Sequence, residues 1–176
     1  MFPAARTKSK FDEDFAKKGL PQEYTDFMAK WDANVLVSFG TTFMPPVDTM
    51  QKIVDMTQLP EMKNTGFIIA LREHNPVFDV ITKLNPKNVM LRTFVPQREI
   101  LATENLNLFL GHCGSNGILE SLYFGKVMIG FAQIDEQVAF CTRMKAIQVV
   151  RTPERTISPQ NLASLISEVA DQSAPE

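Results

Sequence analysis

Cysteine and histidine are both scarce in this sequence. It contains two cysteines, Cys113 and Cys141, and two histidines. Two cysteines cannot build the framework of several disulfides found in small secreted domains, and no C-x-x-C pair or Cys/His cluster supplies the four ligands of a structural zinc site. We therefore expect neither a disulfide framework nor a bound metal.

Long apolar runs and a basic surface are also lacking. No run approaches the roughly 18 apolar residues of a membrane span, and the N-terminus MFPAARTKSK lacks the apolar core of a signal peptide. The formal net charge is -2, and no stretch of Lys and Arg forms a continuous face. We expect a chain that is soluble as given, whose compartment cannot be read, and that does not bind nucleic acid.

The composition is that of one folded unit, since 176 residues with 44% hydrophobic content can bury a substantial core. Short apolar runs rich in β-branched residues recur along the chain, with helical stretches between them. The runs are continuous rather than alternating, which is typical of parallel strands covered by helices on both faces. An α/β fold follows, with predicted strands at 34–39, 67–71, 88–92, 106–111, 126–131 and 147–150.

The predicted organisation has two parts. Residues 1–30 are mostly charged and polar, with LPQEYTDFM as one amphipathic patch, and are interpreted as a lead-in segment packed against the domain edge. Residues 31–176 form the domain. In an open parallel sheet, ligands bind beyond the carboxyl ends of the strands. We therefore look for the site in the loops GTTFMPP, REHNP, TFVPQ, GHCGSN and AQIDEQ.

The loop GHCGSN has the residues of an anion site. Gly114 allows a tight turn and a close backbone approach, while Ser115 and Asn116 stand at the start of a helix, where N–H groups attract an anion. His112 ends a buried strand and would direct an imidazole N–H at a phosphate oxygen. The alternative for His112 is a ring satisfied within the core. No Lys or Arg lies between Gly111 and Gly125, so dipoles, hydroxyl and amide groups and His112, rather than a fixed cation, would hold the anion.

A carboxylate follows one turn later on the same helix. Asn116 and Glu120 are four residues apart and share a helix face, whereas Ile118, Leu119 and Leu122 are expected to face the sheet. A carboxylate at this depth suits the paired hydroxyls of a ribose. The alternative for Glu120 is a helix-capping or solvent-facing side chain.

The linked segments FVPQREIL (94–101), GHCGSNGILESLYFGKVMIGF (111–131), DEQ (135–137) and RMKA (143–146) resemble the donor-binding domain of UDP-glycosyltransferases, the family that includes the glucuronosyltransferases. The likeness extends from about residue 20 to the final helix. It implies a Rossmann-like parallel sheet, the C-terminal half of a GT-B glycosyltransferase.

The resemblance implies a set of donor contacts. Phe94 takes the place of the family's tryptophan that stacks on uracil, with Gln97 near the base edge. Ser38 and Thr41, in SFGT, would lie near the diphosphate. The remaining phosphate contacts would come from His112, Ser115 and Asn116, and the ribose contact from Glu120.

The chain also departs from the family pattern. The Asp-Gln pair that contacts sugar hydroxyls aligns with Glu136-Gln137, while Asp135 lies one position early. The identity of the sugar is therefore open, with glucose or glucuronic acid implied by the family. Arg72 and His74 are interpreted as a surface turn. Cys113 is interpreted as a small space-filling residue rather than a nucleophile.

The implied reaction is inverting transfer of a sugar from a UDP-sugar, the donor substrate, to an acceptor hydroxyl, without a cofactor or a metal. Family members carry the acceptor site and the histidine base in an N-terminal half, which has no counterpart here. We therefore expect a donor-binding half without catalytic residues of its own, inactive alone, whose complete enzyme acts on a lipophilic hydroxylated acceptor. Animal members usually lie in the endoplasmic reticulum membrane through a C-terminal span.

Two alternatives remain at this point. Besides the donor-binding half of a complete enzyme, the first alternative is a single-domain donor subunit that works with a separate acceptor-binding membrane protein, and the second is a non-catalytic nucleotide-binding module. In the second alternative the replacements at Phe94 and Glu136 would be signs of drift, and a loss of UDP affinity would favour it.

Overall fold

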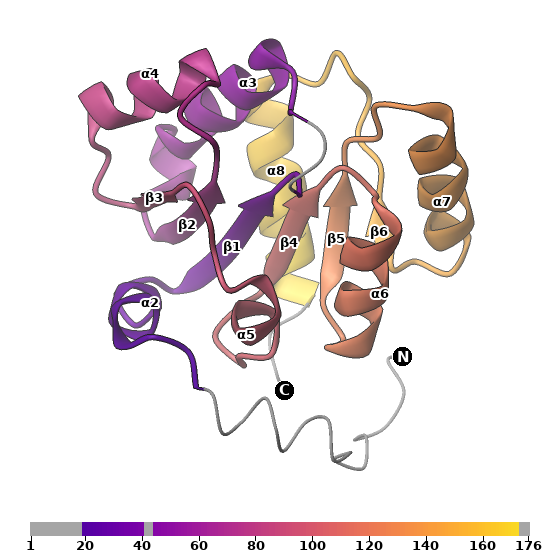
Figure 1. The fold of residues 1–176 in the computed structure, drawn as a ribbon, viewed down its shortest axis with the longest axis horizontal. Coiled ribbons are helices and arrows are strands. Elements are labelled where there is room, and N and C mark those ends of the chain that lie inside the picture. Colours follow the sequence, from indigo (N-terminus) through magenta and orange to yellow (C-terminus); the bar gives the residue numbers. More distant parts are fainter. Residues whose placement is uncertain (1–18, 41–43, 173–176) are drawn as a thin grey trace.

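The structure is a computed structural model that describes residues 19–40 and 44–172. Six strands form one parallel sheet in the order β3-β2-β1-β4-β5-β6, with helices on both faces (Figure 1). The strands are β1 (Ala33–Ser38), β2 (Thr65–Ala70), β3 (Val89–Arg92), β4 (Leu108–Gly111), β5 (Val127–Gly130) and β6 (Val150–Arg151). The predicted α/β fold class is confirmed.

Each predicted strand has a counterpart, but the last begins later than expected. The predicted strand at 147–150 is reduced to β6, because Ile147 ends the preceding helix and Gln148 has a φ of 61°. A left-handed residue interrupts an extended run. Ile147 is accordingly exposed rather than buried in the sheet.

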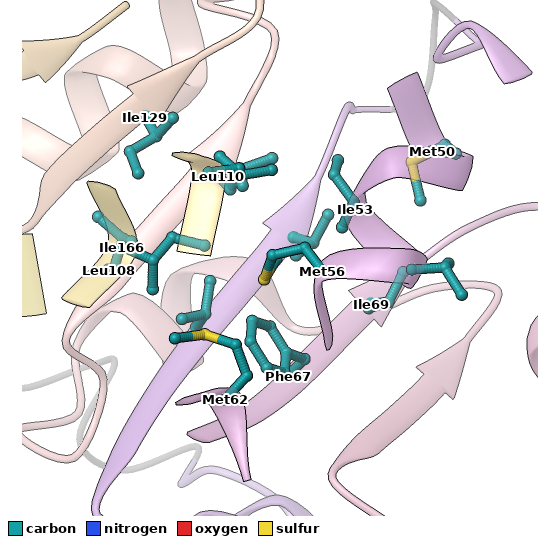
Figure 2. Packing of buried hydrophobic residues seen from close by; sticks show 14 of the residues in the cluster. Met50, Ile53, Met56, Met62, Phe67, Ile69, Leu108, Leu110, Ile129 and Ile166 are labelled. Carbon is teal, nitrogen blue, oxygen red and sulfur yellow. The ribbon is translucent and has the colours of Figure 1, made fainter. Parts of the chain in front are cut away.

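Alternate residues of the central strands point to opposite faces and build two hydrophobic layers. Val35 and Val37 of β1 face one layer, whereas Leu36 between them faces the other. The first layer, seen in Figure 2, is covered by α3 (Val47–Thr57), α4 (Pro76–Leu84) and α8 (Pro159–Gln172). The second is covered by α2 (Gln22–Met28), α5 (Gln97–Leu101), α6 (Ser115–Tyr123) and α7 (Asp135–Ala146). A short 3-10 turn, η1 (Pro60–Met62), precedes β2.

Part of the expected lead-in segment belongs to the core. Tyr24, Phe27 and Met28 of α2 are buried against Leu36 of β1 and Ile68 of β2. The helix therefore covers a face of the sheet rather than only its edge. The division of the chain at residue 30 stays a prediction.

The N-terminus of α4 is fixed by a buried capping residue, Asn75. Asn75 is fully buried, and its side-chain oxygen accepts a hydrogen bond of 3.0 Å from the Val77 N–H at the start of α4. Its amide group donates to the carbonyl oxygen of Pro45 at 3.1 Å. One side chain thus joins the loop after β1 to the loop after β2.

The sheet order changes direction between β1 and β4, which are adjacent in space although β2 and β3 lie between them in the chain. The connections from these two strands therefore leave on opposite sides, which opens a crevice at the carboxyl ends of the strands.

Candidate nucleotide-sugar site

A cavity of about 1180 Å³ lies at the carboxyl ends of the strands. It is larger than the ~300–1,000 Å³ of an ordinary small-molecule pocket. Ten of the eleven residues predicted from the sequence line it, while Thr41 lies outside the described residues. The ten are Ser38, Phe94, Gln97, His112, Gly114, Ser115, Asn116, Glu120, Glu136 and Gln137.

The imidazole of His112 lies between two glycines. A Cβ atom at Gly40 would lie 2.9 Å from Cε1 of the ring, and a Cβ atom at Gly114 would overlap its Nε2. Gly40 also has a φ of 75°, which favours glycine. The ring is therefore held against two backbone segments, one after β1 and one after β4, and it lines the cavity.

Partial burial lowers the pKa of His112 below its usual value, because desolvation penalises the charged imidazolium. The shift favours the neutral imidazole, which carries one N–H. The histidine is thus both packed and exposed to the cavity, so the two sequence interpretations of His112 are not exclusive.

The turn after β4 differs from the expected one. Gly114 has an ordinary φ of -64°, whereas Cys113 adopts the left-handed conformation with φ 61°. Any residue could adopt the backbone conformation of Gly114, but a side chain there would overlap the ring of His112. Glycine is therefore needed at this position to make room for the ring. The sharp reversal occurs at Cys113.

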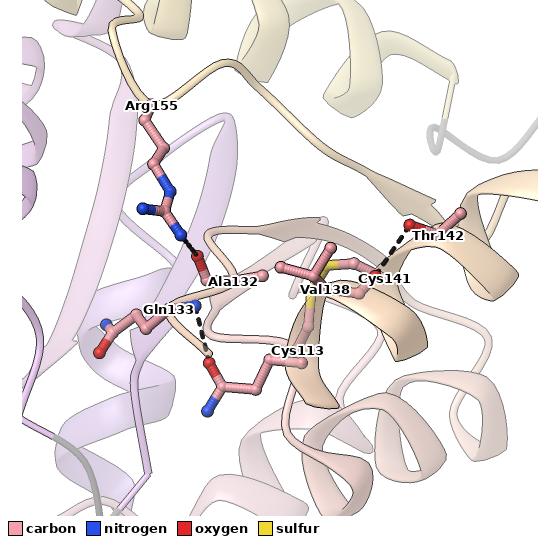
Figure 3. The surroundings of a disulfide bond; sticks show 8 residues. Cys113, Ala132, Gln133, Val138, Cys141, Thr142 and Arg155 are labelled. Atoms are coloured by element: carbon pink, nitrogen blue, oxygen red, sulfur yellow. Dashed lines mark hydrogen bonds between the residues drawn. A yellow bond between two sulfur atoms is a disulfide. The ribbon is translucent and has the colours of Figure 1, made fainter. Parts of the chain in front are cut away.

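Cys113 forms a disulfide with Cys141 of α7, which corrects our interpretation of Cys113 as a space-filling residue (Figure 3). Both cysteines are buried. A Cβ atom at Gly130 would overlap Cys113 Sγ and lie 2.6 Å from Cys141 Sγ, so this glycine at the end of β5 leaves room for both sulfurs. The bond joins the turn of His112 to the helix of Glu136.

The first turn of α6 opens onto the cavity. Gly114 is its N-cap, and no described side chain caps the helix or places an acidic group in its first turn. The N–H groups at Ser115 and Asn116 and the helix dipole therefore face a space free of competing negative charge from this turn. Such a helix start is a general anion site.

The same helix presents less apolar surface to the core than expected. Ile118 is 1% exposed and packs inward, but Leu119 is 62% and Leu122 39% exposed. The expectation that all three face the sheet is wrong for Leu119 and Leu122. A nine-residue helix beside an open cavity has only a narrow buried face.

Glu120 is held from two directions. Gln97 Nε2 donates to Glu120 Oε2 at 2.7 Å, and Arg98 Nε donates to Glu120 Oε1 at 2.6 Å. The hydrogen bond and charge of Glu120 raise the pKa of the Arg98 guanidinium. The sequence analysis missed Arg98, although its position directly after Gln97 in FVPQREIL was a signal.

Two further predicted residues come from α7. Glu136 is exposed and lines the cavity, whereas Gln137 is 3% exposed and its Oε1 accepts a hydrogen bond of 2.8 Å from the Gln133 N–H. Gln137 therefore shapes the loop that carries Glu136. Asp135 does not appear among the described residues that line the cavity, which favours Glu136 over Asp135 at this position.

The rest of the cavity wall combines a predicted residue, Phe94, with residues that the sequence analysis did not include. Phe94 is 72% exposed and offers an open ring face at the cavity. Arg72 and His74, interpreted as a surface turn, are exposed but also line the cavity, as does Met44. Arg72 and His74 lie just after β2, and this position at a strand end could have identified them as candidate site residues.

The strand ends approach closely at the base of the site. A Cβ atom at Gly111 would lie 2.7 Å from the carbonyl oxygen of Ser38, so the glycine at the end of β4 permits this contact with β1. Ser38 is buried and lines the cavity.

Two wider searches of the described residues gave negative findings. Residues 19–40 and 44–172 contain no group of three or more His, Cys, Asp or Glu side chains suited to hold a metal ion. Within the same ranges no helix combines the length and the apolar character required to cross a membrane.

Comparison with known proteins decides the family. Residues 9–174 match the UDP-glucuronosyl and UDP-glucosyl transferase family. The chain belongs to this family. Among curated relatives, an anthocyanidin 3-O-glucosyltransferase of Solanum melongena is 38% identical over 104 residues, covering 54% of this chain and 22% of its own length. A mogroside IIIx synthase of Siraitia grosvenorii is 24% identical over 159 residues, covering 82% and 34% respectively.

Solved glycosyltransferases share the fold. The Os79 T291V structure from O. sativa, in complex with UDP, has a TM-score of 0.70 and 21% identity, covering 85% of this chain and 35% of that chain. The fold is the Rossmann-like domain of a GT-B glycosyltransferase, as predicted. This UDP-glycosyltransferase chain thus spans about a fifth to a third of the length of these relatives.

Proposed function

We propose that the cavity binds the UDP part of a UDP-sugar. The observation that carries this proposal is the meeting of His112, the first turn of α6 and the Glu120 carboxylate in one cavity. A neutral N–H donor and a helix start suit a diphosphate, and a carboxylate one turn further suits ribose hydroxyls. Family membership and the UDP complex of Os79 support the same interpretation.

The diphosphate lies at the start of α6 in this proposal. The imidazole N–H of His112 and the groups of Ser115 and Asn116 bind its oxygens, with Gly114 allowing the close approach of the ring. Ser38, at the end of β1, lies on the opposite wall, and Thr41 in the same loop is assigned to the diphosphate from the sequence pattern alone.

The uridine lies against α5. Phe94 stacks on uracil with its exposed ring, which supplies less area than a tryptophan would. Gln97, whose Nε2 is engaged with Glu120, keeps its carbonyl oxygen for the base edge. Glu120 accepts hydrogen bonds from the ribose hydroxyls, and the Glu136-Gln137 pair lies where the sugar would extend.

The reaction that the domain serves is inverting displacement at the anomeric carbon by an acceptor hydroxyl, with glucose or glucuronic acid as the sugar transferred. The start of α6 and His112 stabilise the charge that develops on the departing UDP, because their dipoles are already oriented. We assign the acceptor site and the base that takes the hydroxyl proton to another part of the complete protein, so that this chain binds donor but does not transfer sugar by itself.

Calorimetric titration with UDP tests the proposal. His112→Ala and Glu120→Ala are each expected to weaken UDP binding by about 1–3 kcal/mol, the range for a lost hydrogen bond involving a charged group. ADP is the control ligand and is expected to bind more weakly than UDP. Unchanged UDP affinity in both variants would contradict the assignment of the cavity.

A further inference from the structure

Two neighbouring residues of α5 hold the two oxygens of one carboxylate. Gln97 Nε2 lies 2.7 Å from Glu120 Oε2, and Arg98 Nε lies 2.6 Å from Glu120 Oε1. The Glu120 side chain is 16% exposed, while that of Arg98 is 51% exposed. The carboxylate is therefore nearly enclosed, and its orientation is fixed at two points.

This arrangement leaves acceptor capacity for a ligand. An ionised carboxylate offers about four lone-pair positions, and Gln97 and Arg98 occupy two of them, one on each oxygen. Each of the two carboxylate oxygens therefore keeps a lone-pair position that can accept a hydrogen bond from one of two vicinal hydroxyls. A carboxylate already fixed in one plane also loses less conformational entropy when it binds them.

Arg98 also changes the charge of the site. An unpaired carboxylate beside a diphosphate site would repel the anion, because like charges in a concave site interact strongly. The guanidinium of Arg98 offsets the Glu120 charge and lies on the cavity wall. The segment from Gly111 to Gly125, which contains Glu120, has no Lys or Arg of its own that could offset this charge.

We propose that Arg98 is a positioning residue that orients Glu120 toward the ribose and thereby sets the preference of the site for ribonucleotides over 2′-deoxyribonucleotides. This inference rests on the proposed donor site. Arginine suits the role because its planar guanidinium fixes a hydrogen-bond direction, whereas lysine supplies a mobile point charge.

The test compares UDP with 2′-deoxy-UDP by calorimetric titration of the full chain. We expect the unaltered chain to prefer UDP by about tenfold, the equivalent of one hydrogen bond to a charged acceptor. Arg98→Met is expected to reduce this preference to about twofold, and Arg98→Lys to restore only part of it.

A matched control is present in the same chain. Arg92 forms an ion pair of 2.6 Å with Glu23, with side chains 38% and 53% exposed, and neither residue lines the cavity among the described residues. Arg92→Met removes an equally short surface pair and is expected to leave the preference for UDP at about tenfold. A general loss of stability would affect both variants alike.

A double-mutant cycle separates positioning from direct contact. If Arg98 acts through Glu120, Arg98→Met should cause no further loss of preference in a Glu120→Gln background. Additive losses, or an unchanged preference in Arg98→Met alone, would overturn the inference while leaving the donor site standing. If the unaltered chain binds neither nucleotide, the donor-site proposal falls, and the role of Arg98 falls with it.

Discussion

His112 illustrates how a single residue acquires its properties from backbone far away in the chain. Its ring occupies space that side chains at Gly40 and Gly114 would fill. The histidine and Gly114 are visible together in the sequence, but Gly40 lies in another loop. Packing against these segments desolvates the ring and lowers its pKa. The same packing directs the ring at the cavity.

The lowered pKa of His112 predicts how stability depends on pH. The unfolded chain binds the proton with a pKa of about 6.5, whereas the folded chain binds it less readily. The contribution of this group to stability is therefore fully present above about pH 6.5 and decreases as the pH falls through the folded pKa. Urea denaturation at pH 7.5 and pH 5.5 provides the measurement. The unfolding free energy should decrease less from pH 7.5 to pH 5.5 in His112→Gln than in the unaltered chain.

The control for this measurement is His74→Gln, which changes the other, exposed histidine. This variant should keep the pH dependence of the unaltered chain. An equal decrease for all three proteins would contradict the role assigned to His112.

At the scale of elements, helix starts and cross-links place the loops around the cavity. Asn75 caps α4 and binds the loop after β1, while the disulfide of Cys113 and Cys141 joins the turn before α6 to α7. These hydrogen bonds and the disulfide connect elements that are far apart in the sequence. They fix the positions of the loops that carry the site residues relative to one another.

Asn75→Ala is expected to lower the unfolding free energy by about 1–3 kcal/mol. The change removes an N-cap bond to Val77 and leaves the Pro45 carbonyl without its partner in a buried position. Urea denaturation provides the measurement.

The matched control for this cap is Ser158→Ala, since Ser158 Oγ accepts a bond of 3.2 Å from Asn161 N–H in an exposed position. A smaller loss is expected there. Equal losses for the two variants would show that burial of Asn75 adds nothing to the cap.

At the scale of the whole molecule, the described residues form a sheet with two hydrophobic layers and a cavity of about 1180 Å³ at the carboxyl ends of its strands. A ligand that binds only the folded chain adds RT ln(1 + [L]/Kd) to stability, or about 2.7 kcal/mol at a hundredfold excess over Kd. UDP at that concentration should raise Tm by about 5–10 °C for a chain of this size. Scanning calorimetry of the unaltered chain and of Glu120→Ala at the same UDP concentration tests this, since the variant should show a smaller increase.

The strands, the α/β class and the position of the loops could be predicted because hydrophobic runs and helix signals are local patterns. The prediction of β6 was wrong at 147–149 because apolar composition does not reveal the left-handed residue Gln148. Likewise, Leu119 and Leu122 are apolar residues of α6 but are exposed, because only a narrow face of this helix packs on the sheet.

The sequence by itself determined the family, the order of the strands along the chain and ten residues that gather in one cavity, because these depend on linked motifs and on where parallel strands end. Only the tertiary structure decided that Arg98 binds Glu120, 22 residues away, and that Cys113 pairs with Cys141, 28 residues away. Such contacts depend on how separate helices pack on the sheet, and no local period in the sequence encodes that packing.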